Sequence, residues 1–172
     1  MNSHHSELNS YRASVEELFE NNSELIVTNR DKKHAAVLTS ILFQNAKKEV
    51  VLFCQNLDEE FYDSAPIKSA VLCALERGVN VKILIQEEPQ ANELLSELKL
   101  LGSRAELELR KCDKDSEASK SNLNFAVIDQ KAFRLESDRE NNSAFACANN
   151  PKLANDMLQV FNRFREQSSD IK

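Results

Sequence analysis

Hydrophobic and polar residues follow two different periods along the chain. Apolar residues recur at helical spacing in four early segments, residues 15–19, about 35–46, 64–77 and 89–101. Short apolar runs separate these segments, at residues 25–28, 49–53 and 79–85. The run from Val50 to Phe53 is continuous, which is typical of a strand buried on both faces. The first half of the chain therefore predicts strands that alternate with helices.

The second half predicts a different arrangement. Ala105, Leu107 and Leu109 alternate with polar residues, which indicates a strand with one solvated face. The polar residues 111–121 predict an exposed, mobile loop. Three strand-like pieces follow, at residues 124–128, 132–135 and 143–147, and then an amphipathic helix that begins at Pro151. The order predicts an α/β sandwich with a mixed sheet flanked by helices, with an N-terminal helical segment at residues 1–24 and one domain at residues 25–172.

The composition excludes some classes of protein but does not indicate a particular function. The chain has 172 residues, 41% of them hydrophobic, and a formal charge of −6, as an ordinary globular domain has. No apolar stretch approaches the ~20 residues of a membrane span, and the polar start resembles no secretory signal, so we expect a cytoplasmic protein. Gly78 and Gly102, the only two glycines, both follow predicted helices, which leaves no glycine-rich phosphate loop.

The four cysteines are widely spaced, without a C-x-x-C pair or a neighbouring histidine. This spacing argues against a zinc site, and we expect free thiols in a cytoplasmic chain. Cys73 falls on the apolar side of a predicted helix and is expected to pack as a small hydrophobic residue. Cys54 is expected to do the same, but it ends a predicted strand, where ligands of open sheets bind, and is therefore also a candidate ligand-binding residue.

Several local sequences, taken in order, resemble the phospholipase D superfamily. Residues 46–50 read A-K-K-E-V and residues 76–81 read E-R-G-V-N-V, each at a junction between a helix and a strand. Residues 125–129 resemble the end of the superfamily's H-x-K-x(4)-D signature, and Ser137 takes the serine position of the small pair that follows it. The resemblance covers about residues 25–166 and implies the superfamily's α/β fold.

The resemblance fails at the residues that carry the superfamily's chemistry. Counting back from Asp129, Asn122 stands at the histidine position and Asn124 at the lysine position. In the superfamily the histidine attacks phosphorus and the lysine stabilises the phosphate, whereas an amide is neither a nucleophile nor a general acid near neutral pH. Glu136 replaces a glycine that approaches the phosphate, and Arg139 replaces an asparagine. We expect Asn122, Asn124 and Asp129 to line a vestigial pocket without catalysis.

Other candidate site residues lie near the ends of predicted strands. Arg30, Lys33 and His34 form a basic group that could dock a phosphate or a partner's carboxylates, although charged runs are usually solvated. The acidic residues 58–60 and 87–88 could hold a divalent cation, but solvated loop acids are the more common case. We predict neither a metal nor a cofactor.

These observations favour a catalytically degenerate phospholipase D-like domain that acts as a regulatory or protein-binding subunit. Single-unit members of the superfamily pair two copies around one cleft, so the resemblance implies a homodimer. By analogy, the protein partner would be a nuclease or a helicase of a bacterial defence system. The net charge of −6 argues against nucleic acid as a ligand of this domain alone.

Two alternatives stay open. One is an active phosphodiesterase or nuclease with a rearranged site, built around His34 or around a metal held by the acidic loops. The other is a sensor that binds a small molecule or nucleotide in the same cleft.

Overall fold

The computed structural model describes residues 3–29, 31–140 and 143–171. Eight strands form one sheet in the order β1-β7-β6-β5-β2-β3-β4-β8. The strands are β1 (Ile26–Asn29), β2 (Glu49–Cys54), β3 (Asn80–Ile85), β4 (Leu107–Cys112), β5 (Phe125–Ile128), β6 (Ala132–Asp138), β7 (Ser143–Cys147) and β8 (Ser168–Asp170). The helices are α1 (Ser3–Glu20), α2 (Lys32–Asn45), α3 (Glu59–Tyr62), α4 (Ala65–Glu76), α5 (Glu93–Leu100), α6 (Glu117–Lys120) and α7 (Pro151–Arg165).

The sheet is mixed, as the sequence predicts. β2, β3 and β4 are parallel neighbours, and the chain between them runs through α4 and α5. β5 is antiparallel to β2, and β5, β6 and β7 continue as an antiparallel meander. The short strands β1 and β8 close the two edges, each antiparallel to its neighbour. The predicted α/β sandwich with a mixed sheet is confirmed.

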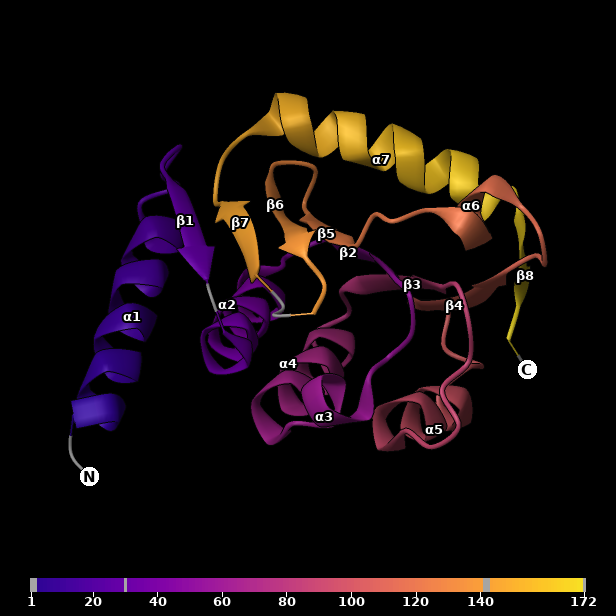
Figure 1. Cartoon of the computed structure of the whole chain (residues 1–172), viewed down its shortest axis with the longest axis horizontal. Helices are drawn as coiled ribbons and strands as arrows, with labels where there is room; N and C mark the ends of the chain where they lie inside the picture. Colours follow the sequence, from indigo (N-terminus) through magenta and orange to yellow (C-terminus); the bar gives the residue numbers. More distant parts are fainter. Residues whose placement is uncertain (1–2, 30, 141–142, 172) are drawn as a thin grey trace.

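Helices cover both faces of the sheet. In Figure 1, α7 lies across one face, and α2, α3, α4 and α5 lie on the other. Strand β2 packs against both layers, because Val50 and Leu52 belong to the hydrophobic cluster that includes α2 and α4, while Val51 and Phe53 belong to the cluster with α7. The continuous apolar run of β2 therefore reflects a strand that is covered on both sides.

The N-terminal helix α1 packs against α2 at the β1 end of the sheet (Figure 1). Val15 is fully buried there among Val37, Leu38 and Ile41 of α2. The Tyr11 hydroxyl donates a hydrogen bond of 3.2 Å to the carbonyl of Thr28 in β1. Helix α1 thus covers part of the outermost strand. No helix among the described residues is both long enough and apolar enough to cross a membrane.

Local sequence signals account for several helix boundaries. The side chain of Asp31 caps α2 by accepting a hydrogen bond from the backbone N–H of His34, and Asn150 caps α7 in the same way through Leu153. Gly78 follows α4 with a φ of 77°, a left-handed conformation that glycine adopts at little cost. The sequence predicted this glycine as a helix end, and the structure confirms it.

Two expectations were wrong in detail, and one strand was not predicted. Residues 111–121 are not simply a loop, because β4 continues to Cys112 and the capped turn α6 follows. Strand β8 was missed, since its polar residues carry no apolar alternation and the strand forms by pairing with β4. Cys73 is exposed, not packed in the core, whereas Cys54 is fully buried. All four cysteines are free thiols, as expected.

Candidate ligand-binding site

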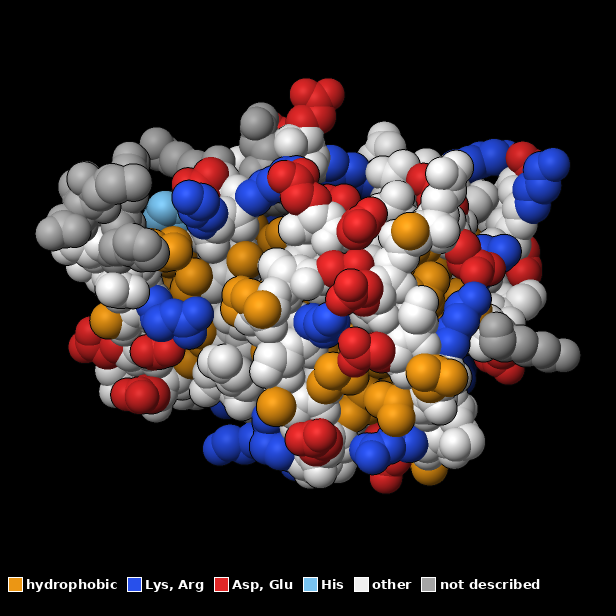
Figure 2. All heavy atoms as spheres, turned by 90° about the horizontal axis from the view of Figure 1, so that it is seen from below, with side chains coloured by type: hydrophobic (Ala, Val, Ile, Leu, Met, Phe, Trp, Pro, Cys, Tyr) orange, Lys and Arg blue, Asp and Glu red, His pale blue; other side chains and the backbone are white. Residues whose placement is uncertain are grey.

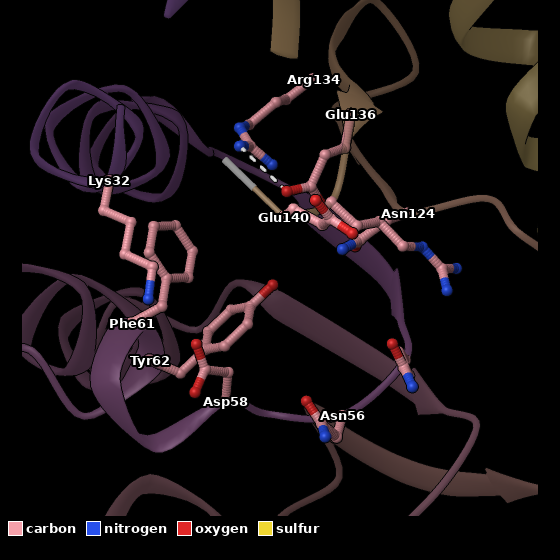
Figure 3. Close-up of a pocket in the computed structure, with 11 residues that line it drawn as sticks. Lys32, Asn56, Asp58, Phe61, Tyr62, Asn124, Arg134, Glu136 and Glu140 are labelled. Carbon is pink, nitrogen blue, oxygen red and sulfur yellow. Dashed lines mark ion pairs between the residues drawn. The ribbon is translucent and has the colours of Figure 1, made fainter. Parts of the chain in front are cut away.

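A polar cavity of about 250 Å³ opens at the edge of the sheet where β2 and β6 end and β5 begins. Its lining comes from four parts of the chain: the start of α2, the segment from β2 through α3, the residue before β5, and the end of β6 with the residues after it (Figure 3). The lining residues are Lys32, Gln55, Asn56, Asp58, Phe61, Tyr62, Asn124, Arg134, Glu136, Arg139 and Glu140.

Strand β6 supplies two buried charged side chains on one side of the cavity. Arg134 and Glu136 are two residues apart, so their side chains leave the same face of the strand. The side chain of Arg134 is 6% exposed and that of Glu136 is 1% exposed. A guanidinium nitrogen of Arg134 lies 4.0 Å from a carboxylate oxygen of Glu136 (Figure 3). The guanidinium also lies 5.9 Å from the centre of the Phe61 ring, within the range of a cation–π contact.

The short helix α3 supplies the opposite side of the cavity. Asp58 caps this helix, and its side chain accepts a hydrogen bond from the backbone N–H of Glu60. Figure 3 shows Asp58 and Tyr62 facing Glu136 and Asn124 across the cavity. Burial raises the pKa of Tyr62 well above its usual value. The Tyr62 hydroxyl is therefore a neutral hydrogen-bonding group at any physiological pH.

Two cations at the rim already have partners. The Lys32 ammonium pairs with the carboxylate of Glu60, and this contact raises the pKa of Lys32. The Arg139 guanidinium donates hydrogen bonds to the carbonyl oxygens of Ser121 (3.2 Å) and Leu123 (2.6 Å). Arg139 therefore fastens the segment before β5 to the end of β6, which positions Asn124 at the cavity.

Formal charges balance among the described residues of the lining. Lys32, Arg134 and Arg139 carry three positive charges, and Asp58, Glu136 and Glu140 carry three negative charges. Tight binding of phosphate in proteins relies on an excess of positive groups and backbone N–H donors around the anion. The described lining, with a buried carboxylate beside its buried guanidinium, does not provide such an excess.

The structure brings two of the predicted motif residues, Asn124 and Arg139, together in the cavity. Asn122 is exposed and is not part of the lining. Ser137 is also exposed, and its hydroxyl donates a hydrogen bond of 3.2 Å to the carbonyl oxygen of Ser143. Only the lysine position of the signature, occupied by Asn124, therefore faces this cavity.

Asp129 lies at the opposite end of β5, so the expectation that it lines the same pocket was wrong. Its carboxylate accepts hydrogen bonds from the backbone N–H groups of Lys47, Lys48 and Glu49, at 2.9, 2.8 and 2.9 Å. These residues lead into β2, whose first residues pair with the end of β5. Asp129 fastens the chain before β2 to the turn after β5.

The other candidate residues do not meet in the cavity. His34 lies in the first turn of α2, where its Nδ1 is 2.7 Å from a carboxylate oxygen of Asp31 and its ring packs edge-on against Tyr11. Lys33 is exposed beside it. Arg30 lies outside the described residues. Of the basic group 30–34, Lys32 alone is among the residues found to line the cavity.

Cys54 sits behind the cavity and is buried in the core. Burial raises the pKa of its thiol to about 12, despite a hydrogen bond with Tyr62 that lowers it. Because the thiolate is the nucleophilic form of cysteine, this thiol is unreactive near neutral pH.

Sequence reasoning missed Arg134 and Tyr62, and it considered Asp58 only as one of the acidic residues 58–60. One signal was present for Arg134: a charged residue interrupts the apolar strand segment of residues 132–135. A charge within a buried strand needs a partner, and Glu136 follows at the spacing that places both on one face. The contributions of Asp58 and Tyr62 depend on α3, a helix of four residues that has no sequence periodicity to reveal it.

The acidic loops do not assemble a metal centre among the described residues. No group of three or more histidine, cysteine, aspartate or glutamate side chains is arranged to hold a metal ion there.

Solved structures of similar fold include phospholipase D family members. Nuc from Salmonella typhimurium, described as a phospholipase D family member, matches with a TM-score of 0.65 and 18% identity, over 86% of this chain and 97% of Nuc. NucT from Helicobacter pylori matches with a TM-score of 0.61 and 13% identity, over 86% of this chain and 100% of NucT. The phospholipase D-like fold implied by the sequence is thereby confirmed.

An archaeal chromatin protein, TrmBL2, has the same fold over a longer stretch of this chain. It matches with a TM-score of 0.62 and 20% identity, over 96% of this chain, which spans 65% of the length of TrmBL2. TrmBL2 is described as showing a novel mode of DNA binding. At these identities the three likenesses concern the fold alone.

Sequence comparison matches a family and no individual curated protein. The model of a family described as a domain of unknown function (DUF7931) matches residues 30–172. None of the curated proteins compared with the chain matches it. The matched region includes the whole cavity lining and leaves α1 and β1 outside.

Proposed function

We propose that this chain, which belongs to the DUF7931 family of domains of unknown function, is a phospholipase D-like domain that binds and does not cleave. The proposal rests mainly on one observation. At the edge of the sheet where Asn124 takes the lysine position of the superfamily's signature, the cavity holds an amide and a buried Arg134–Glu136 pair. Histidine is absent from the described lining.

The lining opposes phosphodiester chemistry for two physical reasons. In the superfamily a histidine attacks phosphorus, and the described lining offers amides, a protonated phenol, carboxylates and cationic side chains in its place. Phosphoryl transfer also needs positive groups around the developing negative charge, and the Glu136 carboxylate would repel that charge. These features support a role in binding, in which the domain acts as a regulatory or protein-binding subunit.

The assembly is part of the proposal. A homodimer in the cytoplasm, joined to a protein partner such as a nuclease or helicase of a defence system, is the arrangement we propose by analogy with the superfamily. Size-exclusion chromatography with light scattering would measure the mass of the chain in solution. A mass of about one chain, 19.5 kDa, at micromolar concentration would argue against the homodimer.

A second candidate is an active phosphodiesterase that uses His34. One observation favours it: the Asp31 carboxylate lies 2.7 Å from Nδ1 of His34, the kind of contact that orients a catalytic imidazole. A capping role explains the same contact, because Asp31 also accepts the backbone N–H of His34 at the start of α2. We therefore place this candidate second.

A turnover assay separates the two candidates. The purified chain is incubated with bis(p-nitrophenyl) phosphate and with single- and double-stranded nucleic acid, each with and without Mg²⁺ or Mn²⁺. We expect no product above the buffer control for the wild-type chain or for His34→Ala. Product formation that is lost in His34→Ala but kept in the matched surface variant Lys33→Ala would overturn the binding proposal in favour of the second candidate.

A further inference from the structure

A hydrophobic groove of about 280 Å³ lies between α4 and α5. Its lining includes Leu72 and Leu75 of α4, with Leu100 and Leu101 at the end of α5. Leu100 stands at the groove with 85% of its surface exposed. In Figure 2 the hydrophobic side chains on this side of the molecule form a cluster with charged side chains around it. A single exposed leucine is ordinary, but one that adjoins an apolar groove indicates a contact surface.

The charged residues at this groove divide into a paired set and an unpaired set. The Lys68 ammonium of α4 lies 2.7 Å from a carboxylate oxygen of Glu93 and 3.5 Å from one of Glu97, so it links the two helices. Glu76 and Arg104 also line the groove, and both are exposed. Neither of these two side chains forms an ion pair or a hydrogen bond with another residue that the structure describes. One free charge of each sign therefore stands at the margin of the apolar patch.

These features make the patch complementary to itself. In a dimer with twofold symmetry both copies contribute the same surface, so a projecting group and the depression that receives it lie on one patch. Leu100 is the projecting group here, and the groove is the depression. The free charges follow the same rule, because Arg104 of each copy can meet Glu76 of the other. A partner with a uniformly acidic or basic surface would match only one of the two free charges.

We propose that the groove between α4 and α5 is the contact surface between two copies of this chain. Leu100 of each copy packs into the groove of the other, and Arg104 of each copy forms an ion pair with Glu76 of the other. The inference rests on the proposed function, because it locates the homodimer proposed there. It differs from the arrangement implied by the superfamily, in which two copies meet around the cleft.

The sheet edge around the polar cavity is less suited to hold two copies together. The cores of homodimer interfaces are mainly apolar. Charged and carboxamide side chains dominate the described lining of the cavity, whereas four leucines line the groove between α4 and α5. Contact between two copies at the cavity would remove polar groups from water, which is unfavourable, while contact at the groove removes apolar surface.

The size of the face limits the strength of the contact. At about 1.5 Å per residue, the 12 residues of α4 extend over about 18 Å and the 8 residues of α5 over about 12 Å. Packed helices lie about 10 Å apart, so together they present a face of roughly 20 Å in each direction. A second copy on this face would bury less than the ~800 Å² per partner of a standard interface. We therefore expect a reversible dimer with a Kd of about 1–10 µM.

Sedimentation velocity of the full chain over about 1–200 µM tests the proposal. A reducing buffer prevents disulfide formation through the exposed thiol of Cys73. The wild type should pass from a mass of 19.5 kDa to twice that mass as the concentration rises. Leu100→Glu places a charge in the contact and should raise the Kd about tenfold or more. Leu25→Glu is the matched control, because Leu25 is 68% exposed and precedes the edge strand β1, and it should leave the Kd unchanged.

Charge reversals identify the two groups that meet. Arg104→Glu alone and Glu76→Arg alone should each raise the Kd of self-association about tenfold, because each variant brings like charges together. An equimolar mixture of the two variants restores both ion pairs and should form a heterodimer with about the affinity of the wild type. Mixing cannot repair a structural defect in either variant. Circular dichroism establishes that all the variants are folded.

Three results would overturn the inference, and they separate it from the proposed function. A dimer that Leu100→Glu does not weaken, or that Leu25→Glu weakens equally, has its interface elsewhere, and the homodimer itself would stand. A mixture of the two charge variants that associates no better than each variant alone would exclude the ion pair between copies. A wild-type mass of 19.5 kDa at every concentration would refute both the inference and the homodimer. The absence of phosphodiester turnover is tested independently by its own assay.

Discussion

Replacing Asp129 by alanine is expected to destabilise the fold strongly without altering the cavity. The carboxylate accepts three backbone N–H groups, from Lys47, Lys48 and Glu49, at 2.8–2.9 Å. A hydrogen bond to a charged group contributes about 1.5–3 kcal/mol, and the low end applies here because two of the three bonds are exposed. Allowing for non-additivity, we expect Asp129→Ala to lower the free energy of unfolding by about 2–4 kcal/mol.

The backbone at this position adds a second test. Asp129 has a φ of 51° and Gln130 a φ of 59°, as the central residues of a type I′ turn do. Asparagine tolerates this conformation and keeps one acceptor oxygen, so Asp129→Asn should lose only about half as much stability as Asp129→Ala.

Urea denaturation followed by circular dichroism measures these differences. Asp156→Ala, on the exposed side of α7, is the matched control and should stay within about 0.5 kcal/mol of the wild type. If Asp129→Ala falls within the same limit, the three hydrogen bonds contribute little. The structural role assigned to Asp129 would then be wrong.

Three further predictions concern the cavity pair and two helix ends. A double-mutant cycle with Arg134→Met and Glu136→Gln, measured by urea denaturation, should give a coupling energy of about 1–3 kcal/mol between the two side chains. A coupling energy near zero would show that the two charges do not stabilise each other. Gly78→Ala should lower the free energy of unfolding by about 1–2 kcal/mol, because the φ of 77° at this position is unfavourable for alanine. The added Cβ would have no atom within 4 Å, so backbone strain alone accounts for the loss. An unchanged melting curve would contradict this expectation. Partial burial raises the pKa of Asp31, but hydrogen bonds from His34 outweigh it and lower the pKa below its usual value. The stability advantage of the wild type over Asp31→Asn should therefore be present at neutral pH and decline as the pH falls through the folded pKa, and a difference that grows toward low pH would contradict the sign.

Much of the fold could be predicted because its signals are local. The apolar run of β2, the alternation in β3 and the stripe of α7 each reflect the burial of one short segment, and the structure confirms all three elements. Gly78 marked the end of α4 for an equally local reason, the steric demand of a positive φ. Strand β8 was not predictable in this way, since its position depends on pairing with β4, about 60 residues earlier.

The site was predicted only in part, because it is assembled from segments far apart in the sequence. The signature positions led to Asn124 and Arg139, which do line the cavity. The same signature wrongly placed Asp129 in the pocket, because Asp129 and Asn124 lie at opposite ends of β5. The position of the Arg134–Glu136 pair at the cavity could not be predicted, because it depends on which face of β6 turns toward α3. The alternation of residues along a strand does not give that orientation.

The apolar groove between α4 and α5 has a different character from the cavity. Leu72, Leu100 and Leu101 line it, with Glu97 and Arg104 at its margin, and Figure 2 shows hydrophobic side chains gathered among charged ones on this face. Leu100 is 85% exposed. A face of this composition is compatible with the protein-binding role that we propose, since exposed apolar patches often mark contact surfaces.

The central claim is that this phospholipase D-like domain binds a ligand at the sheet edge and does not cleave phosphodiesters. The most direct measurement is the rate of p-nitrophenol release from bis(p-nitrophenyl) phosphate by the purified chain, with and without Mn²⁺. We predict a rate equal to that of the buffer alone, for the wild type and for His34→Ala alike. A wild-type rate above the buffer that falls to background in His34→Ala would contradict the claim.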